Sequence, residues 1–350
     1  MMIFWRLTMK FTLFTTGGTI ASAPSEDGLR PKLSGRELVN LCPALEGFEH
    51  DIRVVDLMSK DSSNMQPDDW FAMVQHIRQS ASDCDAVILL HGTDTMAWTA
   101  SALSYLLPDV PIPVVLTGSM LAPEARDSDA ADNLYTAVQM SMQLALYRRQ
   151  GVAVVFDDVL IHGPRAAKAD SRRRHAFVSV DYPLLGEMRD RGQYKIPWLS
   201  SKRPKLSPSR PWGGSPLPAL ERNVAILPIF PGMPVRLLDA ILDARPAALV
   251  LEGFGLGGVP FTGENLLPSI DRGIRAGVPI VVRTQALFGG TDLGVYEVGE
   301  KVMDLGAIGA RDMTREALVV KLMLLLPLAA GPRELERLLG QNLCDDVEGE

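Results

Sequence analysis

Apolar strand-like runs alternate with helix-like runs over the first 190 residues, and this pattern constrains the fold more than any other feature. The runs at 86–90 (AVILL) and 113–117 (PVVLT) are continuously apolar, and a segment with helical spacing follows each. Continuous apolar strands separated by helices are typical of a parallel sheet that is covered on both faces. The sequence therefore predicts an α/β domain, doubly wound, with a mostly parallel sheet.

A stretch rich in proline, serine and glycine breaks this pattern at 200–220 and shows no periodicity. Such a composition indicates a linker or an exposed crossing segment. Apolar runs then resume and end in a helical stretch that begins at Thr314. We expect a larger N-terminal α/β catalytic domain at 1–199 and a smaller C-terminal α/β domain at 221–350, since a chain of 350 residues usually forms two domains.

The charge and the hydropathy of the sequence limit the kinds of partner that this protein can bind. The formal charge of −7 argues against nucleic acid as the main partner. The basic run Arg172–Arg174 is expected to be a solvated face, with an anion site as the weaker alternative. The apolar stretch 317–330 contains Lys321 and Pro327, so it predicts a core helix rather than a membrane span.

The cysteines and the N-terminus indicate the compartment. The three cysteines are far apart and lack CxxC or zinc-ligand spacing, which fits a reducing compartment. The apolar N-terminus is interrupted by Arg6 and Lys10 and lacks a cleavage site, so it is a poor signal peptide. We expect a cytoplasmic protein whose translation starts at Met1 or Met9. No metal cluster or glycine-rich nucleotide loop occurs, so no cofactor is expected.

Three clusters of small polar residues follow apolar strands. They are Thr15–Thr19 (TTGGT), Asp61–Met65 (DSSNM) and His91–Met96 (HGTDTM). Each cluster alone could be an ordinary turn or helix cap. In an open parallel sheet, however, ligands bind at the carboxyl ends of the strands. Three such ends in one sheet therefore favour a binding site for a small charged ligand.

A hydroxyl nucleophile at this edge would need a base. The chain has no G-x-S-x-G motif, and its histidines are poorly placed for a Ser-His-Asp arrangement. His91 follows a buried strand and is expected to be a core or supporting residue. Lys168 follows a fifth strand by a short loop at the same edge, and a partly desolvated lysine can act as a base. The alternative is an ordinary surface lysine.

In order and separation, TTGGTIAS and HGTDTM resemble the two signature motifs of the bacterial asparaginase family. The stretches DSSNM, TGSM with DSDAADNLYTAV, and Lys168 agree as well, while ILPIFPGM and GAIGARDMTREALVVKL are similar to the cytosolic type I branch. The resemblance covers nearly the whole chain. It implies two α/β domains and hydrolysis of a side-chain amide to a carboxylate and ammonia. It also implies a homodimer or homotetramer in which a neighbour's C-terminal domain completes each site.

The resemblance assigns roles to individual catalytic residues. Thr16 matches the threonine that attacks the amide carbon and forms an acyl-enzyme. Thr93 matches the second catalytic threonine, with Lys168 as its base partner and Asp94 in support. Contacts to two charged groups of the substrate, its α-ammonium and its α-carboxylate, would then hold it in an attack geometry.

The same resemblance implies the substrate contacts. Asp94 would bind the α-ammonium group of an amino-acid amide, and Thr93 would also contact the substrate. Ser62 and Ser63 match the positions that hold the α-carboxylate. The expected partner is therefore a small amino-acid amide, with no nucleic acid and no membrane.

The chain departs from the family at several positions. Leu29 aligns with the loop tyrosine that lies close to the nucleophile, and Gly258 aligns with an asparagine that reaches the neighbouring site. Loss of an acid–base participant typically costs 10²–10⁴-fold in rate. Glu252, Ala167 and Ala286 occupy positions of an effector site in some type I enzymes, without the usual polar or thiol residue. We therefore expect non-cooperative kinetics.

These departures keep several functions open beside the leading one, hydrolysis of L-asparagine to L-aspartate and ammonia. One alternative keeps the threonine mechanism but acts on glutamine, a D-amino-acid amide, or an amidated peptide or tRNA-linked substrate. Another is a family member that binds amino acids without turnover, although the two threonines, Asp94 and Lys168 all survive. No feature supports a purely structural protein.

Overall fold

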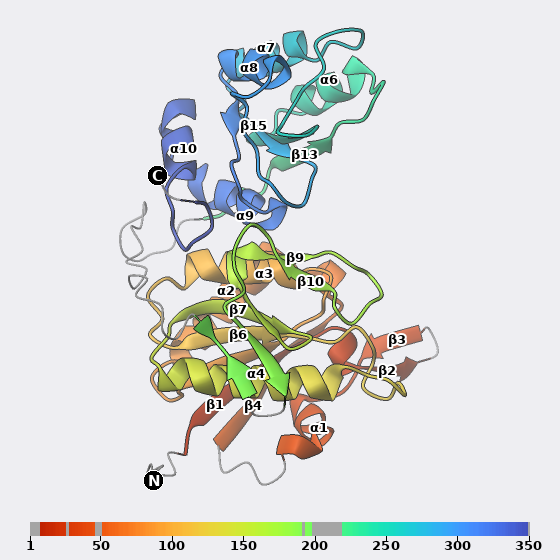
Figure 1. Cartoon of the computed structure of the whole chain (residues 1–350), viewed down its shortest axis with the longest axis vertical. Helices are drawn as coiled ribbons and strands as arrows, with labels where there is room; N and C mark the ends of the chain where they lie inside the picture. Colours follow the sequence, from red (N-terminus) through yellow and green to blue (C-terminus); the bar gives the residue numbers. More distant parts are fainter. Residues whose placement is uncertain (1–7, 26–27, 46–50, 191–192, 198–218, 349–350) are drawn as a thin grey trace. The chain divides into compact units, whose positions relative to one another are not determined.

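The computed structural model describes residues 8–25, 28–45, 51–190, 193–197 and 219–348. The chain divides into two compact units, Met1–Lys205 and Leu206–Glu350 (Figure 1). Each unit is an α/β structure, the first being the larger, so the predicted fold class is confirmed. Most of the expected linker at 200–220, and the candidate start residue Met1, lie outside the described residues.

The main sheet of the first unit contains eight strands among the described residues, in the order β12-β11-β8-β7-β6-β5-β1-β4. Strands β4, β1, β5, β6 and β7 are parallel, and β8, β11 and β12 form an antiparallel edge. The bounds are β1 Lys10–Gly17, β4 Asp51–Lys60, β5 Ala86–Leu90, β6 Pro113–Thr117, β7 Gly151–Phe156, β8 Val159–His162, β11 Gly186–Asp190 and β12 Gln193–Lys195.

Helices pack on both faces of this sheet, with α2 and α3 on one face and α4 on the other (Figure 1). The central strands are buried on both faces, which explains their continuously apolar sequences. Ser34 caps α1 through a capping box with Glu37. The bounds are α1 Gly35–Asn40, α2 Pro67–Ser80, α3 Met96–Leu106 and α4 Ala130–Leu146.

The segment that carries Lys168 differs from the expected short loop after a parallel strand. Asp157 and Asp158 have φ values of 45° and 63°, which is the backbone of a tight two-residue hairpin turn. The chain therefore returns antiparallel as β8 before a 3-10 turn at Gly163–Arg165. Lys168 ends the following strand, β9 (Ala166–Lys168), which pairs with β10 (Phe177–Ser179).

Among its described residues, the second unit contains a four-stranded parallel sheet in the order β13-β14-β15-β16. Its apolar core gathers residues from β13, β14 and β15 and from α6, α7 and α8, including Leu238, Leu251 and Ile270. The strands are β13 Val224–Pro228, β14 Ala248–Gly253, β15 Ile280–Thr284 and β16 Ile308–Gly309. The helices are α6 Val235–Asp243, α7 Leu267–Arg275, α8 Glu297–Asp304, α9 Arg315–Leu325 and α10 Pro332–Leu339.

The apolar stretch near the C-terminus forms the buried helix α9, as predicted, with Thr314 as its N-cap. Lys321 lies within this helix and is fully buried beside Asp346, which explains how a lysine fits in an apolar run. Within the described part of the chain, no helix has the length and apolar character needed to cross a bilayer. The basic run Arg172–Arg174 is exposed, as expected of a solvated face.

Candidate active site

The three predicted polar clusters follow β1, β4 and β5, which are adjacent strands of the main sheet. The backbone of the first cluster touches both of its neighbours. Gly18 N donates to Lys60 O at 2.9 Å, and a β-carbon at Gly18 would lie 2.2 Å from Gly92 Cα. Gly17 and Gly18 also have positive φ values of 99° and 79°. These glycines therefore allow a sharp turn and a contact between two strand ends.

The second and third clusters meet through Ser62. A β-carbon at Gly92 would lie 2.6 Å from Ser62 Oγ, so no side chain fits at this position. Thr95 occupies the N-cap position of α3, yet its hydroxyl caps no helix amide and donates to Ser62 O at 2.8 Å. The simple capping interpretation of this cluster is therefore wrong for Thr95, because its hydroxyl ties the two strand ends together.

Thr16 lies at the end of β1 and is 1% exposed. Its hydroxyl donates to Leu90 O at 3.0 Å, which directs the side chain toward the end of β5. The preceding Thr15 faces the other way, because successive side chains of a strand alternate, and its hydroxyl donates to Asp56 Oδ1 at 2.8 Å. Of the two adjacent threonines, Thr16 is therefore the one on the side of the second motif.

Lys168 lies on β9 and contacts the second signature motif, HGTDTM (His91–Met96). Its Nζ donates to Thr93 Oγ1 at 2.8 Å and to Asp94 Oδ1 at 2.6 Å. The side chain of Lys168 is 17% exposed and that of Asp94 is 63% exposed, while Thr93 is buried. Lys168 is therefore not an ordinary surface lysine, because its amine is held against a buried hydroxyl.

His91 is fully buried, as expected, and its hydrogen bonds define one tautomer. Its Nδ1 lies 2.7 Å from Gly92 O, which can only accept, so Nδ1 carries the proton. Its Nε2 then accepts from Thr99 Oγ1 at 3.0 Å, and that hydroxyl accepts from Trp70 Nε1 at 3.1 Å. Burial lowers the pKa of His91 to about 4, so the ring is neutral near pH 7. His91 supports the Gly92 backbone and faces no hydroxyl nucleophile.

The family resemblance also relates three other residues to the site, namely Ser63, Leu29 and Gly258. Ser63 is exposed, and its hydroxyl donates to Asp61 Oδ1 at 2.7 Å. The backbone of Leu29 lies in the short hairpin strand β3 (Gly28–Pro31), paired with Pro24. Gly258 lies in a tight loop of the second unit, where a β-carbon would meet Val298 at 2.8 Å. No side chain extends from this position.

Glu252, one of the expected effector positions, lies buried at the end of β14. Its carboxylate accepts from Arg283 Nη1 at 2.7 Å and from Arg315 Nε and Nη2 at 2.7 and 2.8 Å. Both carboxylate oxygens are therefore engaged within the unit. Ala167 is also buried, and Ala286 carries no polar group.

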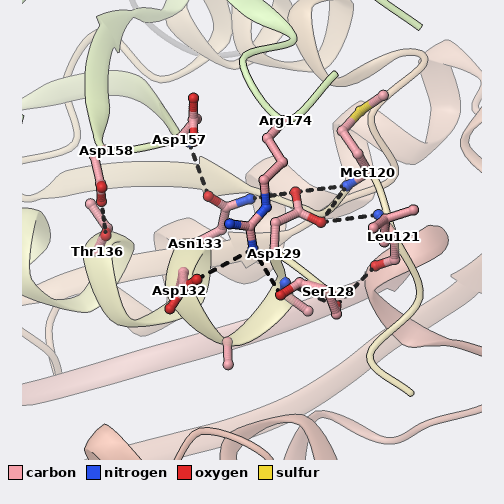
Figure 2. Close-up of polar contacts among 12 residues, drawn as sticks. Met120, Leu121, Ser128, Asp129, Asp132, Asn133, Thr136, Asp157, Asp158 and Arg174 are labelled. Carbon is pink, nitrogen blue, oxygen red and sulfur yellow. Dashed lines mark hydrogen bonds and ion pairs between the residues drawn. The ribbon is translucent and has the colours of Figure 1, made fainter. Parts of the chain in front are cut away.

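A polar network that was not predicted lies next to the second motif. Asp129 and Asn133, both buried, bind the backbone of the loop that follows β6 (Figure 2). The signal in the sequence was the spacing of four residues between them at the start of a helix. Within the described residues no group of histidine, cysteine, aspartate or glutamate is arranged to hold a metal ion.

Two family models match the chain. Residues 10–200 match "Asparaginase, N-terminal", and residues 223–339 match "Glutaminase/Asparaginase C-terminal domain". An L-asparaginase of Thermococcus kodakarensis is 36% identical over 343 residues, covering 97% of this chain and all of the relative. A solved structure of the thermostable L-asparaginase from that organism has a TM-score of 0.86 at 35% identity, covering 98% of this chain and all of that one.

A second type of relative is also similar. A glutamyl-tRNA(Gln) amidotransferase component of Methanopyrus kandleri is 33% identical, covering 97% of this chain and 75% of the relative. Taken with the fold, these matches define the chain as an amidohydrolase built of two α/β units. It belongs to the asparaginase family.

Proposed function

We propose that this protein hydrolyses L-asparagine to L-aspartate and ammonia through an acyl-enzyme on Thr16. The observation that carries the proposal is the set of hydrogen bonds from Lys168 Nζ to Thr93 Oγ1 and Asp94 Oδ1. This geometry, in which a hydroxyl contacts an amine that a carboxylate orients, suits Thr93 for the activation of an attacking water, and Thr16 is assigned as the nucleophile by its match to the family motif.

In the proposed reaction, Thr16 Oγ attacks the side-chain amide carbon of asparagine and its proton passes to the leaving nitrogen. The C–N bond then breaks, ammonia leaves, and an ester of Thr16 remains. Water, activated by Thr93 with Lys168 as its base partner, attacks the ester carbon. The bond from that carbon to Thr16 Oγ breaks, a proton from the water returns to Thr16 Oγ, and aspartate leaves. Asp94 also binds the substrate's α-ammonium, for which its 63% exposed side chain is accessible.

The α-carboxylate of the substrate would be held by Ser62 and Ser63. Ser62 lies beside Gly92, and a carboxylate ligand would have to draw the Ser63 hydroxyl away from Asp61. Since Leu29 replaces the loop tyrosine of the family, the first proton transfer from Thr16 would run without that tyrosine.

The direct test is ammonia release from millimolar L-asparagine, L-glutamine and D-asparagine by the purified protein. We expect the highest kcat/KM with L-asparagine. We also expect a hyperbolic rate curve, because the Glu252 carboxylate is already bonded to two arginines. Some relatives are named as glutamyl-tRNA(Gln) amidotransferase components, so the second candidate function is amide chemistry that serves a tRNA-linked substrate. Ammonia from glutamine but not asparagine would favour it and contradict the asparaginase proposal.

Replacing Lys168 by methionine should lower kcat for L-asparagine by about 10²–10⁴-fold, the usual contribution of a positioned acid or base. The substitution removes the amine from Thr93 Oγ1 and keeps a side chain of similar length. The rate of ammonia release at saturating substrate measures the effect.

Two further variants interpret the Lys168 result. Lys168→Arg keeps the charge but cannot accept a proton, so it should be as impaired as Lys168→Met if the amine acts as a base. Lys60→Met removes another 2.6 Å ion pair, with Asp69, and should retain wild-type kcat. Full activity of Lys168→Met would contradict the proposed role.

The finer assignments are also proposals. The type I branch is supported by the similarity of ILPIFPGM and GAIGARDMTREALVVKL, and a homodimer or homotetramer by the family resemblance. A cytoplasmic location is supported by the cysteines, which all lie in the described part of the chain and form no disulfide.

A further inference from the structure

The loop that follows β6 packs directly on the second motif. His91 N donates to Thr117 O at 2.8 Å, and a β-carbon at Gly118 would lie 2.3 Å from His91 O. The same β-carbon would be 3.5 Å from Thr93 Cγ2. The Gly118 backbone is therefore packed tightly on His91 and lies close to the methyl group of Thr93.

A buried carboxylate gathers the amides of this loop. Both oxygens of Asp129 accept from Met120 N, at 3.1 and 2.9 Å, and Oδ1 also accepts from Leu121 N at 3.0 Å (Figure 2). Asp129 is 3% exposed and sits at the N-cap position of α4, yet its side chain caps no amide of that helix. Its oxygens accept from the loop instead.

Asn133, one turn along α4, completes the network. Its Nδ2 donates to Gly118 O at 2.9 Å and to Asp129 Oδ2 at 3.0 Å, while its Oδ1 accepts from Asp157 N at 3.0 Å. The side chain is 2% exposed and uses both of its N–H groups. A single amide thus joins the end of β6, the carboxylate of Asp129 and the turn after β7.

The Asp129 carboxylate accepts hydrogen bonds from two loop amides and from Asn133 Nδ2, whereas those of Arg174 go to other residues. The Arg174 guanidinium donates to Ser128 O at 3.0 Å and to Asp132 Oδ2 at 3.4 Å (Figure 2). The carboxylate of Asp129 is instead held by backbone amides, whose positions it fixes in return. Such directional bonds specify a loop conformation more tightly than a charge contact does.

We infer that Asp129 and Asn133 are positioning residues that clamp Gly118–Leu121 against Thr93 and so fix Thr93 for the reaction. The inference rests on the proposed function, because it assigns Thr93 to the reaction. Misplacing a reacting group by about 1 Å can cost about 10²-fold in rate. The clamp therefore matters for turnover although neither side chain needs to touch substrate.

The test compares Asn133→Leu with Thr136→Val. Thr136 lies on the same helix, is 1% exposed, and donates to Asp158 Oδ1 at 2.8 Å, so its loss affects the same turn but not the loop. Asn133→Leu should lower kcat for L-asparagine by about 10–100-fold, with a smaller change in KM. Thr136→Val should keep wild-type kcat.

A second variant and a second measurement cover the case in which Asn133→Leu does not fold. Asp129→Asn keeps the shape but turns an N–H group toward donors, and should also lower kcat. Amide hydrogen exchange of a peptide spanning 117–122 should be faster in both variants than in the wild type and in Thr136→Val. Normal kcat in Asn133→Leu and Asp129→Asn would overturn the inference, as would an equal loss in Thr136→Val.

Failure of the proposed function gives a different result. In that case the wild type itself releases no ammonia from L-asparagine. The exchange measurement then decides alone whether the clamp holds the loop, and unchanged exchange in Asn133→Leu and Asp129→Asn would overturn it.

Discussion

Replacing Thr16 by alanine is expected to reduce ammonia release from L-asparagine by about 10⁴–10⁶-fold in kcat, the range found when a hydrolase loses a member of its nucleophilic machinery. Thr16 is 1% exposed and its hydroxyl points to Leu90 O at the end of β5, so alanine removes the hydroxyl from that strand end. The folded state should lose only one buried hydrogen bond, about 0.5–1.5 kcal/mol.

Thr15→Val is the matched control for this result. Thr15 is the adjacent buried threonine, on the opposite face of β1, and its hydroxyl bonds to Asp56. Its replacement should cost stability comparable to that of Thr16→Ala while kcat stays near the wild-type value. Thr16→Ser keeps a hydroxyl and should retain measurable turnover. Turnover by Thr16→Ala comparable to that of the wild type would exclude the acyl-enzyme mechanism.

The sequence was sufficient to predict the main sheet and the edge at which polar residues meet. Strands β5 and β6 are continuous apolar runs, and such runs reflect local burial that needs no knowledge of partners. Parallel strands share a carboxyl edge, so three polar clusters after three strands had to lie on one side. That they follow adjacent strands is a property of topology, which the spacing alone does not contain.

The antiparallel edge of the sheet was not predicted, and neither were α8 and β16. Within that edge β12 has three residues, and in the second unit β16 has two, so their periodicity is too short to read. The hairpin at Asp157–Asp158 lacks the glycine that usually marks a turn with positive φ. Short edge strands are determined by the sheet they join rather than by their own residues.

The clamp of Asp129 and Asn133 was not predicted for a different reason, because their spacing at a helix start does not identify the groups that they bind. Its partners are backbone amides and a carbonyl, which every residue carries, so no residue type at 118–121 announces them. The same limit applies to Thr95, where cap-forming residues in the sequence suggested a helix cap. In the structure this hydroxyl instead donates a hydrogen bond to Ser62 O, 33 residues earlier in the sequence.

Replacing Lys321 by methionine is expected to lower the free energy of unfolding by about 3–5 kcal/mol, the usual cost of leaving one partner of a buried ion pair uncompensated. Lys321 and Asp346 are both fully buried, with Nζ 2.6 Å from Oδ2. The amine also donates to Leu339 O at 2.8 Å and Gln341 O at 2.7 Å. Methionine would leave a buried carboxylate and two carbonyls without this donor.

Urea unfolding followed by far-ultraviolet circular dichroism measures the loss, and two variants test its cause. Adding Asp346→Asn to Lys321→Met removes the buried charge while Oδ1 can still accept from Leu343 N, so the double variant should regain part of the stability. Arg275→Met removes a cation from an exposed pair with Asp271 and should cost less than about 1 kcal/mol. If the double variant were no more stable than Lys321→Met, the loss would come from packing and not from the uncompensated charge. A loss as small as that of Arg275→Met would show that the buried pair does not hold the C-terminal segment to α9.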